Sequence, residues 1–278
     1  MKDDFASGLL AGWLSVLALH PFDTIAVRMQ TQVFGGQQYK GTVDCLATII
    51  RQESAFALYK GFLPPLLVFG IHDSVAYGTY GTILDRLVET NAPFGASVFL
   101  AGIAAGSACA FIDTPMEMIK TRLQIEGKGR RRRRDERRVF ATLDCARKLY
   151  AKHGLRRGIY RGFTAGFPHS LLYTSLSFLF FESFRARQSG GLGRVALAGG
   201  TAGVLSWILA HPLDVVKSRM QADDLARPAY RNVVDCARKS RGSLYCGLVP
   251  CLLRVFPEDA IFFAVVTMYY RYFAHRSS

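Results

Sequence analysis

Three segments of the sequence place an acidic residue close behind a proline and, in two of the three, a base three positions after the acid. They are residues 21–30, 115–124 and 212–221, and each ends in glutamine. Residues three apart share one face of a helix, so such an acid and base can both meet partners on neighbouring helices. The spacing predicts ion pairs between helices. The first segment has Ala26 at the position where the other two have Lys120 and Lys217.

Other landmarks recur with these segments in the same order, so the chain of 278 residues divides into three modules of nearly equal length. A glycine pair four residues apart precedes each proline, and this spacing lets helix backbones approach closely. A Tyr-x-Gly triplet follows each segment. The glycine pairs are Gly8 and Gly12, Gly102 and Gly106, and Gly199 and Gly203, and the triplets end at Gly61, Gly162 and Gly247.

With these residues the chain resembles the mitochondrial carrier family, whose signature is Pro-x-acid-x-x-base-x-base-x-Gln in each of three repeats. The resemblance covers essentially the whole chain. It implies an all-α membrane protein with six transmembrane helices in three pseudo-threefold repeats and short matrix surface helices. The repeats would be residues 1–90, 91–188 and 189–278, joined in one structural unit. It also implies a multi-pass protein of the mitochondrial inner membrane.

The expected helices follow from the signatures, the glycines and the loops between them. Long helices are expected at 5–30, 63–89, 95–124, 165–187, 192–221 and 249–273, and surface helices at 42–52 and 141–151. Proline should bend the first, third and fifth long helices. The third repeat is shortened, because Asp235 and Gly247 are 12 residues apart and the corresponding pairs are 17 and 18 apart. About one turn of its surface helix should therefore be missing.

Composition alone leaves the membrane assignment open. Hydrophobic residues make up 50% of the chain and charged residues 20%, which would also fit a soluble protein with a large core. The candidate span 97–112 has 16 residues without a charge, fewer than the roughly 18 of a plain membrane span. Polar residues are expected in spanning helices that line a water-filled cavity, so the repeat decides the assignment.

The net charge of +14 fits either a nucleic-acid surface or loops on the positive side of a membrane. Residues 129–138 contain seven arginines, and the family has a matrix loop at this place. We therefore expect a basic loop near anionic lipid head groups and no nucleic-acid partner. The start of the chain shows no presequence, so targeting would be internal. No Cys-x-x-Cys or Cys/His spacing occurs, and neither a metal site nor a cofactor is expected.

The resemblance assigns the charged residues to two gates. At the matrix gate Asp23 would pair with Lys120 and Glu117 with Lys217, while Asp214 would face Ala26. Each bridge would be braced by a glutamine among Gln30, Gln124 and Gln221. At the cytosolic gate only Glu182 and Arg185 fit the family pattern.

Substrate contacts in the family lie on the even-numbered helices, seven residues after the repeated glycine. The corresponding residues here are Val68, His169 and Arg254, with Ser170 beside His169, and His72, Tyr173 and Glu258 follow one turn later. The arginine fork suits a carboxylate. Glu258 could serve a cationic group of the solute, or it could pair with Arg254.

The sequence looks most like the carnitine/acylcarnitine and basic amino-acid branch of the family. Our leading interpretation is therefore a monomeric transporter, not an enzyme, that moves a small carboxylated, amine-bearing metabolite by alternating access. An amino acid, a methylated amino acid, carnitine and an acylcarnitine all fit. Cardiolipin is the expected lipid partner. Two alternatives stay open: a degenerate carrier that acts as a membrane interaction protein, and a soluble nucleic-acid-binding protein.

Overall fold

Six long helices dominate the part of the chain that the structure describes. The computed structural model describes residues 2–32, 39–90, 92–125, 138–186, 191–225 and 228–274, and every regular element in these ranges is a helix. This confirms the helical prediction, with bounds within three residues of the expected ones except where noted below. The long helices are α1 (Lys2–Gln30), α3 (Leu63–Glu89), α4 (Phe94–Ile125), α6 (Phe163–Ala186), α7 (Leu192–Ala222) and α9 (Leu248–Ala274).

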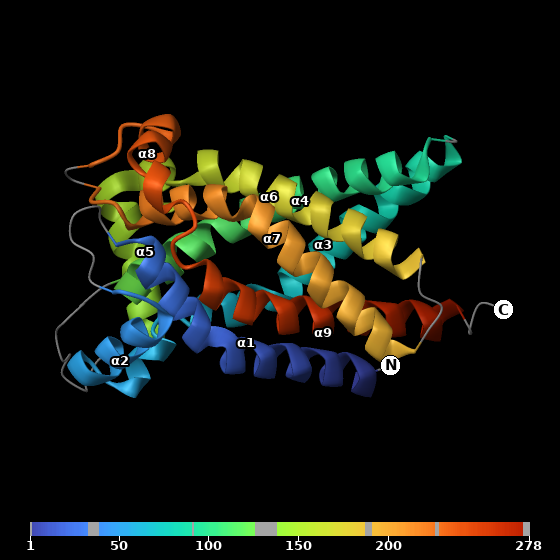
Figure 1. Cartoon of the computed structure of the whole chain (residues 1–278), viewed down its shortest axis with the longest axis horizontal. Coiled ribbons are helices and arrows are strands. Elements are labelled where there is room, and N and C mark those ends of the chain that lie inside the picture. The colour runs from blue at the N-terminus through green and yellow to red at the C-terminus, as the bar shows by residue number, and fades with distance from the viewer. Residues whose placement is uncertain are drawn as a thin grey trace.

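The long helices lie along the long axis of the molecule, and the short helices gather at one end of it (Figure 1). The short helices are α2 (Thr42–Gln52), α5 (Arg138–Gly154) and α8 (Val233–Lys239). The first helix begins and the last helix ends at the opposite end (Figure 1). Short 3-10 or π turns, Ala55–Tyr59, Leu155–Ile159 and Arg241–Ser243, follow the three short helices. Each repeat thus runs from the far end to the short helices and back.

The signature prolines lie inside helices and do not end them. Pro21, Pro115 and Pro212 stand in α1, α4 and α7, and each helix continues for at least nine residues beyond its proline. A proline inside a helix removes one hydrogen bond of the ladder. The acids and bases of each signature are therefore carried on the last turns of a long helix, which holds them at fixed positions.

The glycine pairs of the second and third repeats lie where two helices touch. A methyl group on Gly102 would lie 2.5 Å from the Cα of Ser175, and one on Gly106 would lie 2.6 Å from the carbonyl oxygen of Ser170. One on Gly199 would lie 2.8 Å from Phe263. These distances are too short for any side chain, so the predicted close approach is confirmed for α4 with α6 and for α7 with α9. Gly8 and Gly12 lie outside the described side chains.

A glycine in the left-handed backbone conformation precedes the second long helix of each repeat, α3, α6 and α9. Gly61, Gly162 and Gly247 have φ angles of 74°, 87° and 81°, a region that other residues rarely adopt. A methyl group on Gly61 would lie 3.0 Å from the carbonyl of Lys120, and one on Gly247 would lie 3.0 Å from the carbonyl of Ala26. Each turn therefore packs against the signature of another repeat.

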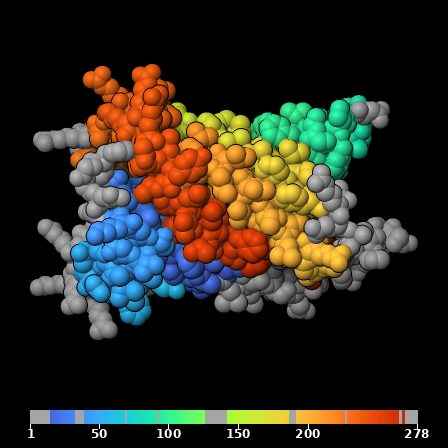
Figure 2. All heavy atoms as spheres, viewed as in Figure 1, coloured from blue at the N-terminus to red at the C-terminus, as the bar shows by residue number. Residues whose placement is uncertain are grey.

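The surface helices differ in length, as the shortened third repeat predicts. Helix α8 has 7 residues, whereas α2 has 11 and α5 has 17. Helix α5 begins three residues earlier and ends three residues later than expected. Helices α2 (light blue) and α8 (orange) project at the same end of the molecule (Figure 2). The arginine-rich segment falls mostly within residues 126–137, outside the described residues.

Two of the described helices are long and apolar enough to cross a membrane by composition alone. These are Phe94–Ile125 and Leu192–Ala222. A third candidate span exists if the segments Ala55–Val68 and Gly70–Glu89, which meet at 46°, count as one.

Candidate functional site

Ion pairs join the signatures of neighbouring repeats. Lys120 on α4 pairs with Asp23 on α1, and the Lys217 Nζ on α7 lies 2.9 Å from Glu117 Oε1 on α4. Both lysines are more than four-fifths buried. A buried charge is tolerated when a partner of opposite sign lies close to it, so these contacts tie three helices together at one level.

The third acid, Asp214, has a different set of partners. Its Oδ1 lies 3.1 Å from Nζ of Lys217 in the same helix, and its Oδ2 accepts a 2.7 Å hydrogen bond from Gln30 of the first repeat. His169 Nε2 lies 3.9 Å away. Ala26 lies with Asp214 in the lining of the cavity described below, and its side chain has no polar group. Asp214 is thus stabilised by a neutral donor from the first repeat in place of a cation.

The other two signature glutamines contact threonines and not the ion pairs. Gln124 donates to Thr24 at 3.3 Å, and Gln221 accepts from Thr121 at 3.2 Å. The expectation that each glutamine braces a bridge therefore does not match the hydrogen bonds of these two. The Gln124 amide joins the second signature to the first, and the Gln221 amide joins the third signature to the second.

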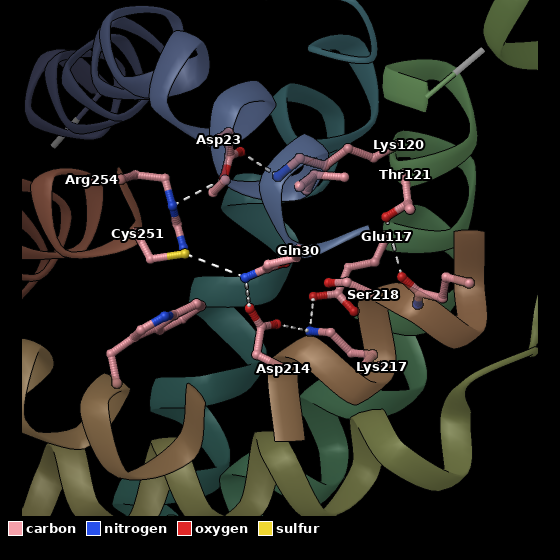
Figure 3. A pocket seen from close by; sticks show the side chains of 14 residues that line it. Asp23, Gln30, Glu117, Lys120, Thr121, Asp214, Lys217, Ser218, Cys251 and Arg254 are labelled. Carbon is pink, nitrogen blue, oxygen red and sulfur yellow. Dashed lines mark hydrogen bonds and ion pairs between the residues drawn. The ribbon is translucent and has the colours of Figure 1, made fainter. Parts of the chain in front are cut away.

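Most of these residues line an open cavity, in which the space not filled by atoms, counted together with solvent at its open side, is about 440 Å³. Figure 3 shows it from close by, with Asp23 between Lys120 and Arg254, and Lys217 between Glu117 and Asp214. Helices α1, α4, α7 and α9 contribute its lining. The predicted matrix-gate residues, except Gln124, and the predicted solute-binding arginine therefore line one cavity.

Arg254 is the residue that connects the cavity to the ion pairs. Its Nε lies 3.0 Å from Asp23 Oδ1, its NH1 group pairs with Glu258 one turn further along α9, and its guanidinium lies 5.0 Å from the ring centre of Trp207. A guanidinium over an indole face gains a cation–π attraction. Sequence reasoning missed Trp207, although a tryptophan within a predicted spanning helix was a usable signal.

An aromatic group borders Arg254 on the side of α6 and α7. The His169 and Tyr173 rings stack at 6.1 Å, and Trp207 meets both edge to face. The Tyr173 hydroxyl donates to Asp259 at 2.6 Å. His169 and Tyr173 of α6 and Arg254 and Glu258 of α9 therefore lie close together.

The predicted contact positions on α3 lead to a second acidic region. His72 Nδ1 lies 2.8 Å from Asp113 Oδ1 on α4, and electrostatic interactions link Asp73 with His72, Asp113 and Glu258. Sequence reasoning missed Asp73 and Asp113. A charge inside an apolar helix of a membrane protein marks a functional position by default, and this signal could have found both.

Val68 and Ser170 contribute least to this polar surface. Val68 is buried in α3 and has no polar atom in its side chain. The Ser170 hydroxyl donates to the carbonyl of Gly106 at 2.9 Å, which joins α6 to α4.

Acidic groups outnumber permanent cations in this interior. Among the described residues, seven carboxyl groups belong to the connected network, and three lysine or arginine side chains accompany them, an excess of four acids over lysine and arginine. His72 lies 2.8 Å from Asp113 and offsets one of these acids when it is protonated. The acids are Asp23, Asp73, Asp113, Glu117, Asp214, Glu258 and Asp259, and the cations are Lys120, Lys217 and Arg254.

The opposite end of the helices is joined by aromatic rings. Tyr77 on α3 stacks on Phe262 of α9 at 4.6 Å, and Tyr80 stacks on Phe178 of α6 at 3.8 Å. Phe181 of α6 stacks on Phe263 of α9 at 4.0 Å. We call these six residues the aromatic cluster. They connect α3, α6 and α9, which are the second long helices of the three repeats.

Glu182 and Arg185 lie beside this cluster and contact each other within α6. The distance between Arg185 NH2 and Glu182 Oε2 is 3.3 Å, and the Arg185 side chain is half exposed. The pair therefore links two turns of one helix in this structure and not two helices.

A further ion pair fixes α2 against α1. Arg28 donates two hydrogen bonds, of 2.5 and 3.0 Å, to the Glu53 carboxylate, and Lys60 pairs with the same carboxylate at 2.5 Å. Burial alone would raise the pKa of Glu53, but the hydrogen bonds from Arg28 and Lys60 outweigh it and lower this pKa below its ordinary value. The Arg28 Nε also donates to the carbonyl of Gln124, which joins the first repeat to the second.

Three potential metal ligands approach each other beside the cavity. Within the described residues, His211, Asp214 and Cys251 place one ligand atom each within 4.8 Å. Both nitrogens of His211 already have partners, since Nδ1 accepts from Trp207 and Nε2 lies 3.3 Å from the carbonyl of Cys246. This arrangement fixes the histidine ring and does not present a nitrogen to an ion.

Long helices that surround a charged central cavity, arranged as three sequence repeats, define a membrane transport protein. The family model described as mitochondrial carrier protein matches residues 1–91, 92–192 and 188–277. The chain belongs to the mitochondrial carrier family. It is a transporter and a multi-pass protein of the mitochondrial inner membrane.

Similar proteins cover nearly the whole chain. The chain is 38% identical to the mitochondrial basic amino acids transporter of Rattus norvegicus, over 98% of this chain and 90% of that protein. It is 32% identical to solute carrier family 25 member 45 of Homo sapiens, over 94% and 95%. It is 33% identical to the mitochondrial carnitine/acylcarnitine carrier-like protein of Arabidopsis thaliana, over 95% and 96%.

Proposed function

We propose that the protein transports an amino acid with a cationic side chain by alternating access. The excess of four acidic groups over cations carries this proposal, because charges at membrane depth are costly until they are paired. A solute with net positive charge supplies the missing partners. Arg254 complements its carboxylate. The mitochondrial basic amino acids transporters to which the chain is similar agree with this substrate class.

The same observation ranks the candidate solutes. Carnitine carries one positive and one negative charge, so it leaves the acid excess uncompensated. A basic amino acid, or one that is methylated on its side-chain amine, brings one further positive charge. We therefore place lysine-like and arginine-like solutes ahead of carnitine and acylcarnitines.

The remaining elements of the proposal concern architecture. Helices α1, α3, α4, α6, α7 and α9 would be the six spans of three pseudo-threefold repeats, 1–90, 91–188 and 189–278. The polar residues in the less apolar helices are those expected where a helix lines a water-filled cavity. The protein would act as a monomer. Cardiolipin would bind near the N-termini of the surface helices, and the seven-residue α8 offers the weakest such place.

Two sets of contacts would act as the gates. The ion pairs of Asp23 with Lys120 and of Glu117 with Lys217, together with Asp214 and Gln30, would close the matrix side. On the cytosolic side the aromatic cluster would provide most of the closing contacts. Glu182 and Arg185 would add at most one ion pair there.

Exchange measured in liposomes with the purified protein tests the substrate class. We expect uptake of labelled arginine or lysine against the same internal solute, weaker uptake of carnitine, and none of dicarboxylates. Arg254→Ala should abolish uptake, and Arg254→Lys should also lose most of it because an ammonium cannot form a forked pair with a carboxylate. The matched control is Arg86→Ala, an exposed arginine on α3 that is far along the chain from the cavity residues.

Preferential uptake of a neutral or anionic solute would refute the proposal. If no solute of a broad metabolite panel is exchanged or shifts the thermal midpoint, the alternative of a non-transporting interaction protein is favoured instead. Two features keep this alternative open: Ala26 replaces a signature base, and Glu182 pairs with Arg185 inside one helix and not between helices.

A further inference from the structure

The ion pairs between signatures would form a ring if each repeat contributed one acid and one base. The first repeat is joined to the second through Asp23 and Lys120, and the second to the third through Glu117 and Lys217. The third link would need a base at position 26, where the chain has alanine. By the signature alone, the ring is open between the third and the first repeat.

Arg254 lies where it can close this gap. It belongs to the third repeat, on α9, and its Nε lies 3.0 Å from Asp23 Oδ1 on α1 of the first repeat (Figure 3). Asp23 is thereby shared between Lys120 and Arg254. We propose that Arg254, through Asp23, supplies the ion pair between the third and first repeats that the alanine at position 26 cannot make with Asp214, and that a solute carboxylate opens this link by competing with Asp23.

The surroundings of Arg254 support a structural role in addition to solute binding. Its side chain is 16% exposed and that of Asp23 is 14% exposed, so the pair is largely shielded from solvent and is screened little. Glu258 and the face of Trp207 hold the guanidinium from the other sides. Because the Asp23 partner comes from α1, the contact joins the third repeat to the first as well as neutralising the guanidinium.

The competition follows from chemical equivalence, and this half of the inference rests on the proposed function. A solute α-carboxylate and the Asp23 carboxylate are the same kind of partner for a guanidinium. When the solute takes the position of Asp23, the link between the third and first repeats is broken. Solute binding would then remove one of three inter-repeat ion pairs at the moment when the matrix side must open.

Thermal unfolding of the solute-free protein tests the closure of the ring without any transport measurement. Arg254→Gln should lower the apparent thermal midpoint in detergent. Ala26→Lys should raise the midpoint more in the Arg254→Gln background than in the natural background, because a lysine at position 26 restores a link that is already present when Arg254 is intact. Uptake should stay absent in the double variant.

Two results would overturn this role. One is an unchanged midpoint for Arg254→Gln. The other is an equal effect of Ala26→Lys in both backgrounds, since additivity means that the two positions act independently. Lys120→Gln is the reference variant, because it removes the other partner of Asp23 and should lower the midpoint whichever way Arg254 behaves.

The unaltered protein in liposomes tests the competition. Agmatine is arginine without its carboxylate, so it can occupy the acidic region but cannot displace Asp23. We expect agmatine to inhibit arginine exchange and not to be exchanged itself. Exchange of agmatine at a rate close to that of arginine would refute the competition. Absence of arginine uptake would reject the proposed function, and the unfolding experiment would still decide whether Arg254 closes the ring.

Discussion

Gln30, the last residue of α1, donates a 2.7 Å hydrogen bond to Asp214 on α7, and so connects the first repeat to the acid that faces Ala26. The other two signature glutamines bond neutral threonine hydroxyls. Three equivalent residues therefore make contacts of unequal strength, because one signature lacks its base.

Gln30→Ala should destabilise the protein more than the equivalent substitution in the second repeat. A hydrogen bond to a charged group contributes about 1.5–3 kcal/mol, and a neutral one contributes about 1 kcal/mol. We expect the thermal midpoint of Gln30→Ala to fall by several degrees. Gln124→Ala is the matched control and should fall by less. Equal shifts would show that the charge of Asp214 is not what gives Gln30 its importance.

Ala26→Lys should raise the thermal midpoint, because it supplies Asp214 with a cation from the first repeat. Asp214 already contacts Lys217 and Gln30, so the gain in stability should be modest, about 0.5–1 kcal/mol. This corresponds to a rise of about 1–4 °C in the thermal midpoint. Turnover should slow, since one more ion pair must break in each cycle. In Ala26→Lys with Asp214→Asn the stabilisation should vanish. A gain that survives loss of Asp214 would contradict the pairing.

Glu53→Gln should lower the thermal midpoint strongly, because it leaves the buried Arg28 without its carboxylate. Breaking a buried pair costs about 3–5 kcal/mol. The pKa of Glu53 is lowered in the folded protein, so its contribution is fully present above the ordinary value of 4.5 and is lost as pH falls through the folded pKa. The midpoints of the natural protein and the variant should differ by a constant amount above pH 4.5 and converge as the pH falls further below that value. Parallel curves would exclude this origin.

Phe262→Ala should increase the leak of solute through the protein. Its ring stacks on Tyr77 and so connects α9 to α3 at the end that we propose faces the cytosol, where Glu182 and Arg185 pair within one helix. Efflux from preloaded liposomes without external solute measures this leak. Phe180→Ala is the control, because Phe180 stacks on Phe184 of its own helix. Equal efflux from both variants would refute a closing role for the aromatic cluster.

The sequence by itself determined the repeat and the helices, and its resemblance to the family indicated the pairs of Asp23 with Lys120 and of Glu117 with Lys217. Local features indicate each helix, such as the positions of Pro21, Gly61 and the uncharged stretches. Such features can be read from the sequence without knowledge of the fold. The missing base at Ala26 and the shortened third repeat were also visible in the sequence, because they are departures from an internal pattern.

The tertiary structure alone decided which partners the irregular residues take. Nothing in the sequence places Arg254 against Asp23, since the two residues lie on different helices and belong to different motifs. The same holds for Gln30 with Asp214 and for Tyr77 with Phe262. A residue that has lost its repeat-related partner takes whichever side chain the packing of α1, α7 and α9 brings within reach, and that distance is set by the whole bundle.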